Sequence, residues 1–289
     1  MRKSVYALGC VLGLSVAAVG AQDLPVKNAK RIVAMDFGAL DTLAELGAAN
    51  KVVALPKENA PEYMSVYTTA AYQNTGGMKS PDLAVIKAAK PDVIIMTGRQ
   101  NAAYDELVKI APTIRYATDS TKYLASAKDN TLMLGEMVGN KALAEQKWAA
   151  LEAKVKGVQA QADASPLKAT VMLHNGGKLM VSNSGYAGFI HDVLHVKKAD
   201  ANVGDERVVV DAAYLNKVNP DLIYIIDRSG AIGQPPLDMK LFADKNMQNV
   251  KAVKNQKVVV LTPKLWYLSG GGLQSIALQA DEVAKHLGQ

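Results

Sequence analysis

Two arginines, Arg99 and Arg228, occupy equivalent places in a pattern that the chain contains twice, 129 positions apart. In each copy an aspartate precedes a Pro-Asp pair by nine positions, an apolar run follows, and an arginine ends the pattern. The matching residues are Asp82, Pro91, Asp92 and Arg99 in the first copy and Asp211, Pro220, Asp221 and Arg228 in the second. A guanidinium group carries a fixed charge and a planar set of N–H donors that suits oxyanions. Two of them at matching places predict a site for an anion with several oxygens.

Each arginine follows an apolar run that is typical of a strand buried on both faces, at residues 93–97 and 222–226. Ligands of open α/β sheets bind beyond the carboxyl ends of the strands. If two such sheets face each other, the two arginines lie on either side of one cleft. The alternative is that each arginine pairs with a nearby carboxylate, for instance Asp105 or Asp227.

Strand-like and helix-like segments alternate through the first half of the chain, which is typical of parallel βα units. The expected strands are residues 32–35, 52–55, 93–97 and 114–116, and the expected helices are residues 39–46, 83–89 and 104–110. The second half begins with a hairpin signal around Gly176-Gly177 and repeats the alternation. It is expected to end in a helix over residues 273–287.

A long helix is predicted between the two halves, over residues 140–164, with Asn140 as its N-cap and no proline before Pro166. The predicted architecture is α/β, with two Rossmann-like lobes (residues 22–139 and 165–289) joined by this one rigid helix and a ligand cleft between them. A helical connector predicts a small closure rather than a wide hinge motion.

The N-terminus has the composition of a secretory signal peptide over residues 1–21. Arg2 and Lys3 precede an apolar segment, and small residues stand at the expected cleavage site after Ala21. Cys10, the only cysteine, lies inside the apolar segment rather than after it, so a cleaved signal and a periplasmic location are favoured over a lipoprotein.

The net charge of +6 is spread along the chain without a block of basic residues interleaved with aromatic ones. Nucleic acid is therefore not expected as a partner. The apolar content of 49% is typical of a well-packed globular protein. We expect a monomer.

Several segments resemble the helical-backbone periplasmic binding proteins of ABC importers, and most of all the enterobactin-type binders of ferric catecholate siderophores. These segments are RIVAMDFGALDTLAELG, the paired Pro-Asp strands, TGRQN, GFIHDVLHV, IIDRS and WYLSGGG. The resemblance covers essentially the whole mature chain. It implies a protein that captures a ferric siderophore in the cleft and delivers it to an inner-membrane permease. Iron would arrive as the siderophore complex, and no cofactor would be bound permanently.

The resemblance also implies roles for particular residues. Arg99 and Arg228 match basic cleft positions, Tyr267 matches an iron-binding tyrosine, and Trp266 stands beside it. Three departures are visible. Tyr186 stands where relatives have a cleft arginine, Glu206 falls where they have an iron-binding histidine, and Ala84 and Ala213 replace glutamates that dock on the permease.

These departures suggest further roles. Tyr267 and Glu206 are expected to ligate iron only where the siderophore leaves coordination positions open, because ferric ion is hard and accepts phenolate and carboxylate oxygen. Asp82 and Asp211 are expected to supply the negative charges for docking on the permease.

Other functions remain open at the level of sequence. A haem or cobalamin carrier of the same fold is the nearest alternative, although haem would favour an apolar cleft with few arginines. A periplasmic hydrolase is the alternative from another class, but no nucleophile elbow or Ser/His/Asp set is visible. His191 and His195, spaced four apart in an expected helix, form a weak metal-binding candidate.

Overall fold

The structure is a computed structural model that describes residues 26–288. The predicted signal peptide, including Cys10, lies outside these residues. None of the helices between residues 26 and 288 combines the length and hydropathy that a bilayer-spanning helix needs.

The first lobe is built on an all-parallel sheet in the order β3-β2-β1-β4-β5. Its strands are β1 (Ile32–Ala34), β2 (Val52–Leu55), β3 (Gln73–Asn74), β4 (Val93–Met96) and β5 (Thr113–Arg115). Its helices are α1 (Phe37–Glu45), α2 (Leu83–Ala88), α3 (Tyr104–Ile110) and α4 (Tyr123–Val138), with 3-10 turns η1 (Ala49–Lys51), η2 (Glu62–Tyr67) and η3 (Gly98–Ala103). Every residue of β1 and β4 is buried, as the apolar runs predict.

The second lobe has a mixed sheet in the order β11-β10-β6-β7-β9, with β8 beside β6. Its strands are β6 (Lys168–Asn175), β7 (Lys178–Val181), β8 (Lys197–Lys198), β9 (Val208–Val210), β10 (Leu222–Asp227) and β11 (Val258–Leu261). Its helices are α6 (Tyr186–Gly188), α7 (Ala212–Val218), α8 (Arg228–Ala231), α9 (Lys251–Lys254), α10 (Pro263–Tyr267) and α11 (Leu273–Ala284), with the π-helical turn η4 (Phe189–Val193) and the 3-10 turn η5 (Met239–Ala243).

The predicted hairpin joins β6 to β7 through Gly176 and Gly177, whose φ angles are 57° and 77°. Two consecutive residues with positive φ are what a tight hairpin requires, and glycine adopts them without strain. The antiparallel β7 and β9 make this lobe differ from the all-parallel first lobe.

The aspartates of the sequence repeat are structural. Asp82 and Asp211 are the N-caps of α2 and α7; Asp82 accepts hydrogen bonds from two backbone N–H groups of its helix, and Asp211 accepts one. Asp92 accepts from the backbone N–H of Arg31, and Asp221 accepts in the same way from Lys168, so each Pro-Asp joins its strand to the neighbouring one. The repeat therefore builds two equivalent helix-strand units that end at the two arginines.

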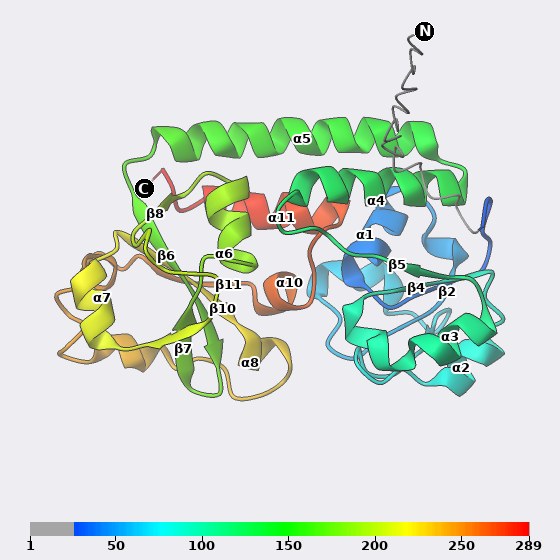
Figure 1. The fold of residues 1–289 in the computed structure, drawn as a ribbon, viewed down its shortest axis with the longest axis horizontal. Helices are drawn as coiled ribbons and strands as arrows, with labels where there is room; N and C mark the ends of the chain where they lie inside the picture. The colour runs from blue at the N-terminus through cyan, green and yellow to red at the C-terminus, as the bar shows by residue number, and fades with distance from the viewer. Residues whose placement is uncertain (1–25, 289) are drawn as a thin grey trace, which may run out of the picture.

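The helix α5 (Lys141–Ala164) connects the lobes, and Figure 1 shows it running along one side of both of them. It begins after Asn140, as predicted, but the Asn140 side chain donates to the carbonyl oxygen of Leu46 instead of capping the helix. The helix α4, which packs beside α5, was not among the predicted elements. Its pattern is weak because polar residues and Gly135 interrupt the apolar positions.

The last helix, α11, belongs to the second half of the chain but begins against the first lobe. The carboxylate of Asp41, in α1, accepts hydrogen bonds from the N–H groups of Gln274 and Ser275 at 3.1 and 3.0 Å. Thr42 Oγ1 accepts from the N–H of Leu273. The first turn of α11 is thus capped by side chains more than 230 residues earlier in the sequence.

Close backbone contact makes this interlobe junction possible. A Cβ on Gly38 would overlap the carbonyl oxygen of Gly270, and a Cβ on Gly272 would overlap the carbonyl oxygen of Gly38. Glycine is required at these positions because no side chain fits between the two segments. The three consecutive glycines before α11 therefore pack against the first lobe, and the helix amides that follow them are occupied by the protein's own carboxylate.

The expectation that His191 and His195 share a helix face is wrong. The helical turn ends at Val193, and His195 adopts a φ of 63° beyond it. His191 bonds to the carbonyl oxygen of Val196, whereas His195 contacts Asp163 of α5. In the part of the chain that the structure describes, no three His, Cys, Asp or Glu side chains come together as a metal site.

Candidate functional site

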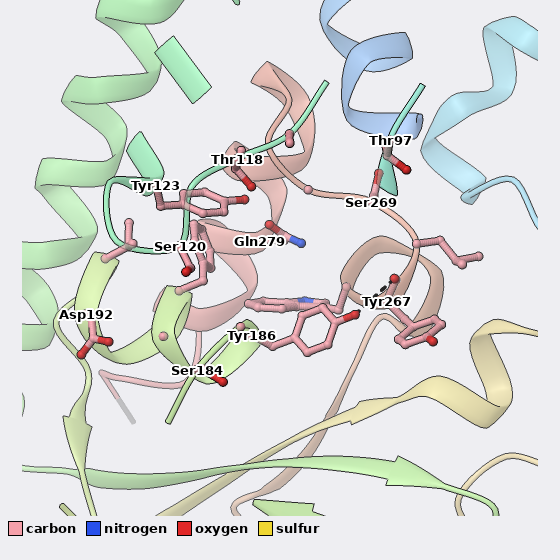
Figure 2. A pocket seen from close by; sticks show the side chains of 18 of the residues that line it. Thr97, Thr118, Ser120, Tyr123, Ser184, Tyr186, Asp192, Tyr267, Ser269 and Gln279 are labelled. Atoms are coloured by element: carbon pink, nitrogen blue, oxygen red, sulfur yellow. Dashed lines mark hydrogen bonds between the residues drawn. The ribbon is translucent and has the colours of Figure 1, made fainter. Parts of the chain in front are cut away.

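A cleft of about 670 Å³ opens between the two lobes. The first lobe contributes the ends of β4 and β5 and the segment before α4, and the second contributes residues 183–189 and the segment from α10 to α11. The volume is in the range of a small-molecule site. Figure 2 shows hydroxyl groups around the cavity from both lobes, among them Thr97, Thr118, Ser120 and Ser269.

Arg99 lies on the cleft wall, three residues after the end of β4. Thr97 caps the turn that carries it, through a capping box with Gln100, and so fixes the direction in which the arginine leaves the strand. Arg99 Nη2 donates to the carbonyl oxygen of Tyr267 at 2.8 Å. Because Tyr267 belongs to the second lobe, this hydrogen bond crosses the cleft.

Arg228 follows directly after β10, as predicted, but it does not line the cleft. Its Nε donates to the phenol oxygen of Tyr267 at 2.9 Å, and its Nη1 donates to Asn175 Oδ1 at 2.7 Å. The guanidinium carbons of Arg99 and Arg228 lie 5.8 and 5.5 Å from the centre of the Tyr267 ring. The feature that lies between the two repeated arginines is therefore Tyr267.

The alternative of local carboxylate partners does not hold for either arginine. Among residues 26–288, neither guanidinium forms an ion pair with Asp105 or Asp227. Asp227 instead accepts from His174 Nδ1 at 2.7 Å. Burial alone would raise the pKa of Asp227, but the hydrogen bonds from His174 and from two backbone N–H groups hold it below its ordinary value. This buried pair anchors the strand end from which Arg228 extends.

Tyr186 and Trp266 complete the predicted part of the cleft wall. Tyr186 donates to the carbonyl oxygen of Tyr267 at 3.3 Å, and the rings of the two tyrosines lie side by side in Figure 2. Burial raises the pKa of Tyr186 to about 12, so its hydroxyl is a neutral donor. Trp266 is 1% exposed, and its Nε1 donates to Glu282 at 2.6 Å, which leaves its ring as a fixed apolar surface.

Glu206 is exposed and is not part of the cleft wall, whereas Asp205, its neighbour, is. Arg99, Tyr186, Trp266 and Tyr267 are thus brought together by the fold. Arg228 contacts the cleft through Tyr267, and Glu206 stands apart.

Asp36 is a cleft residue that was not predicted from the sequence. It follows β1 and caps α1 by accepting from the N–H of Ala39 at 2.9 Å. Burial raises the pKa of Asp36 to about 6, although the hydrogen bond from Ala39 and the charge of Arg99 both oppose this shift. A carboxylate near Arg99 tempers the positive charge of the cleft. Its place directly after an apolar strand was the signal that could have identified it.

Comparison with known proteins decides the family. A family model described as periplasmic binding protein matches residues 32–265. The chain belongs to the periplasmic binding protein family. It is 36% identical to the petrobactin-binding protein YclQ of Bacillus subtilis, over 89% of this chain and 82% of that protein. It is 30% identical to the ferric-anguibactin-binding protein FatB of Vibrio anguillarum, with the same two coverages.

Solved structures agree with this assignment. The crystal structure of YclQ superposes with a TM-score of 0.87 at 35% identity, covering 91% of this chain and 94% of that one. The siderophore-binding protein BauB, solved with two molecules of acinetobactin and ferric iron, gives a TM-score of 0.82 at 29% identity over 90% and 93% of the two chains. The predicted fold of two lobes joined by a long helix is confirmed.

Proposed function

We propose that this protein captures a ferric catecholate siderophore in the cleft between its lobes and delivers it to the permease of an ABC importer. The observation that carries the proposal is the position of Tyr267 at the cleft, between the charges of Arg99 and Arg228. Ferric catecholate complexes are anions, and a partly buried guanidinium pair is suited to neutralise them.

The ligands for which the relatives are named support an iron siderophore. YclQ binds petrobactin, FatB binds ferric anguibactin, and the BauB structure holds ferric iron with acinetobactin. Identity of 30% or more to two of these proteins makes the same general class of ligand the best proposal for this chain. Within that class, the arginines favour an anionic catecholate complex such as the enterobactin type.

Iron is the cargo in this proposal, and the protein needs no resident cofactor and performs no catalysis. A tris-catecholate fills the six coordination positions of ferric ion and needs only neutralisation. A bis-catecholate leaves two positions open, and among the cleft tyrosines we propose Tyr267 to offer a phenolate oxygen to one of them, after its ring turns from Arg228 toward the cavity. A carboxylate could offer the second oxygen; Glu206, the candidate from sequence, is exposed and off the cleft wall, whereas its neighbour Asp205 lines the cleft.

We also propose a cellular location for the protein. The composition of residues 1–21 favours export to the periplasm through a cleaved signal peptide. There the protein would act as a monomer that docks on the inner-membrane permease of its importer.

Titration of intrinsic fluorescence tests the function, because the Trp266 ring forms part of the cleft wall. The purified mature protein is titrated with ferric petrobactin, ferric enterobactin, a ferric trihydroxamate, haem and cobalamin. We expect saturable quenching by at least one ferric catecholate and weaker binding of the other three ligands. Preference for haem or cobalamin would overturn the proposal.

A further inference from the structure

Residues 203–207, which lead into β9, run along the wall of the cleft. Asp205 lines the cleft directly. Ser184 Oγ donates to the carbonyl oxygen of Asp205 at 2.9 Å, and the N–H of Asn183 donates to the carbonyl oxygen of Gly204 at 2.9 Å. Since Asn183 and Ser184 are also cleft residues, the segment is held against the wall and is not a free loop.

Arg207 is the last residue of this segment and stands next to a fixed point of the sheet. The following residue, Val208, pairs with Val181 in the antiparallel ladder between β9 and β7. Val181 lies two positions before the cleft residue Asn183. The backbone of Arg207 is therefore anchored at the edge of the cleft, while its side chain is exposed.

The donors of Arg207 are all available. Within residues 26–288 its guanidinium forms no hydrogen bond and no ion pair, even though Asp205 and Glu206 are close in sequence. The two arginines of the sequence repeat differ in this respect. Arg99 donates to backbone carbonyl oxygens across the cleft, and Arg228 donates to Tyr267 and Asn175. An arginine with five uncommitted N–H groups at the cleft edge is best placed to meet an incoming anion.

The electrostatic surroundings of Tyr186 support this placement. Burial is the main influence on the Tyr186 hydroxyl and raises its pKa, and the positive charges of Arg99, Arg207 and Arg228 oppose that rise. The charge of Arg207 therefore acts on the cleft residue Tyr186, as do the charges of the two repeated arginines.

We propose that Arg207 is a third cationic group of the cleft, which contacts the bound ligand and selects for complexes of high negative charge. The inference rests on the proposed function and adds a residue that determines specificity. Because the side chain is exposed at the edge, it also attracts the anion during approach, so it acts mainly on the association rate.

The experiment compares Arg207→Gln and Arg207→Lys with the matched control Lys245→Gln. Lys245 is exposed and is not a cleft residue, so its replacement removes the same net charge away from the site. Association and dissociation rates are measured by stopped-flow fluorescence for ferric enterobactin, which is trianionic, and for a ferric trihydroxamate, whose iron centre is uncharged.

We expect Arg207→Gln to weaken the binding of ferric enterobactin about fivefold, which is the effect of one exposed charge pair at the upper end of the usual range. Most of the loss should be in the association rate and should shrink at high salt. Arg207→Lys should retain most of the affinity, and Lys245→Gln should have little effect. The role of Arg207, but not the proposed function, would be overturned by either of two results. One is an equal loss of ferric enterobactin affinity in Arg207→Gln and Lys245→Gln. The other is that Arg207→Gln loses as much affinity for the trihydroxamate as for ferric enterobactin. A wild-type protein that binds no ferric catecholate would overturn the proposed function as well.

Discussion

Arg228 Nε donates a hydrogen bond to the phenol oxygen of Tyr267 across 2.9 Å. The bond joins the end of β10 to the end of α10, and the same arginine is held from its other side by Asn175 in the β6–β7 hairpin. Figure 2 shows the Tyr267 ring directed away from the centre of the cavity, as this bond requires. We therefore expect Arg228 to affect the ligand through the position of Tyr267, whereas Arg99 lines the cleft itself.

This difference predicts unequal behaviour of the two arginines in a double-mutant cycle. Arg99→Ala and Arg228→Ala should each weaken binding of a ferric catecholate by about 1.5–3 kcal/mol, the scale of a charged hydrogen bond. In a Tyr267→Phe background the effect of Arg228→Ala should largely disappear, and that of Arg99→Ala should persist. Fluorescence titration gives the affinities, and thermal melting checks that the fold survives. Additive losses for Arg228 and Tyr267 would show that they act independently.

Tyr267→Phe separates ligation of iron from packing. If the phenolate fills an open coordination position, the variant should lose the charge-transfer absorbance of a ferric bis-catecholate complex and bind it much more weakly. A tris-catecholate, which offers no open position, should lose far less affinity. Absorbance spectra and titrations with both complexes make the comparison, and equal losses would assign the tyrosine to packing alone.

Asp36→Asn should strengthen the binding of an anionic complex at neutral pH, by about twofold to fivefold, because it removes a negative charge near Arg99. Asparagine remains a good N-cap, so α1 should be unaffected. With a pKa of about 6, wild-type Asp36 is charged at about pH 7.5 and mostly neutral at about pH 5. The ratio of the affinity of Asp36→Asn to that of wild type should therefore approach one at the lower pH. Any titration of the ligand itself cancels in this ratio. A ratio that does not change with pH would contradict the prediction.

Asp41→Asn tests the junction between α1 and α11. The variant keeps one oxygen acceptor but loses the other, so an N–H of α11 is left unpaired and stability should fall by about 1–3 kcal/mol. Burial raises the pKa of Asp41 to about 7, although hydrogen bonds from Ser275, Gln274 and Tyr63 oppose this. The folded state then holds the proton more tightly than the unfolded state does.

The sign of the pH dependence follows from that difference. Stability that comes from the proton on Asp41 is fully present below about pH 4, the ordinary pKa of the group, and is lost as the pH rises through about 7. The difference in free energy of unfolding between wild type and Asp41→Asn should therefore become smaller as the pH rises over this interval. Urea unfolding at several pH values measures it, and a constant gap would mean that Asp41 does not titrate in this range.

Asp82 and Asp211 remain the proposed docking charges, and their N-cap roles decide how they should be tested. Charge reversal would also remove a cap that contributes about 1 kcal/mol, whereas asparagine caps a helix as well as aspartate does. The double variant Asp82→Asn, Asp211→Asn should bind ligand normally and should slow siderophore uptake in cells. Normal uptake would reject these residues as docking charges.

The apolar runs and the Pro-Asp pairs determined much of the architecture from local information. Residues 93–96 and 222–226 form strands because they are uniformly apolar, and Arg99 and Arg228 follow them as predicted. The helix-favouring composition after Asn140 predicted the connecting helix, although the Asn140 side chain does not cap it. These features depend on residues within a few positions of each other, where propensity and capping act.

The contacts within the site were decided by tertiary structure. Tyr267 meets Arg99 and Arg228 from 168 and 39 positions away, and Asp41 caps a helix more than 230 positions later. Sequence spacing contains no information on such pairings, because they depend on how two sheets and α5 place the lobes. For the same reason the sequence alone selected Glu206, whereas the fold holds Asp205 on the cleft wall and anchors Arg207 at its edge.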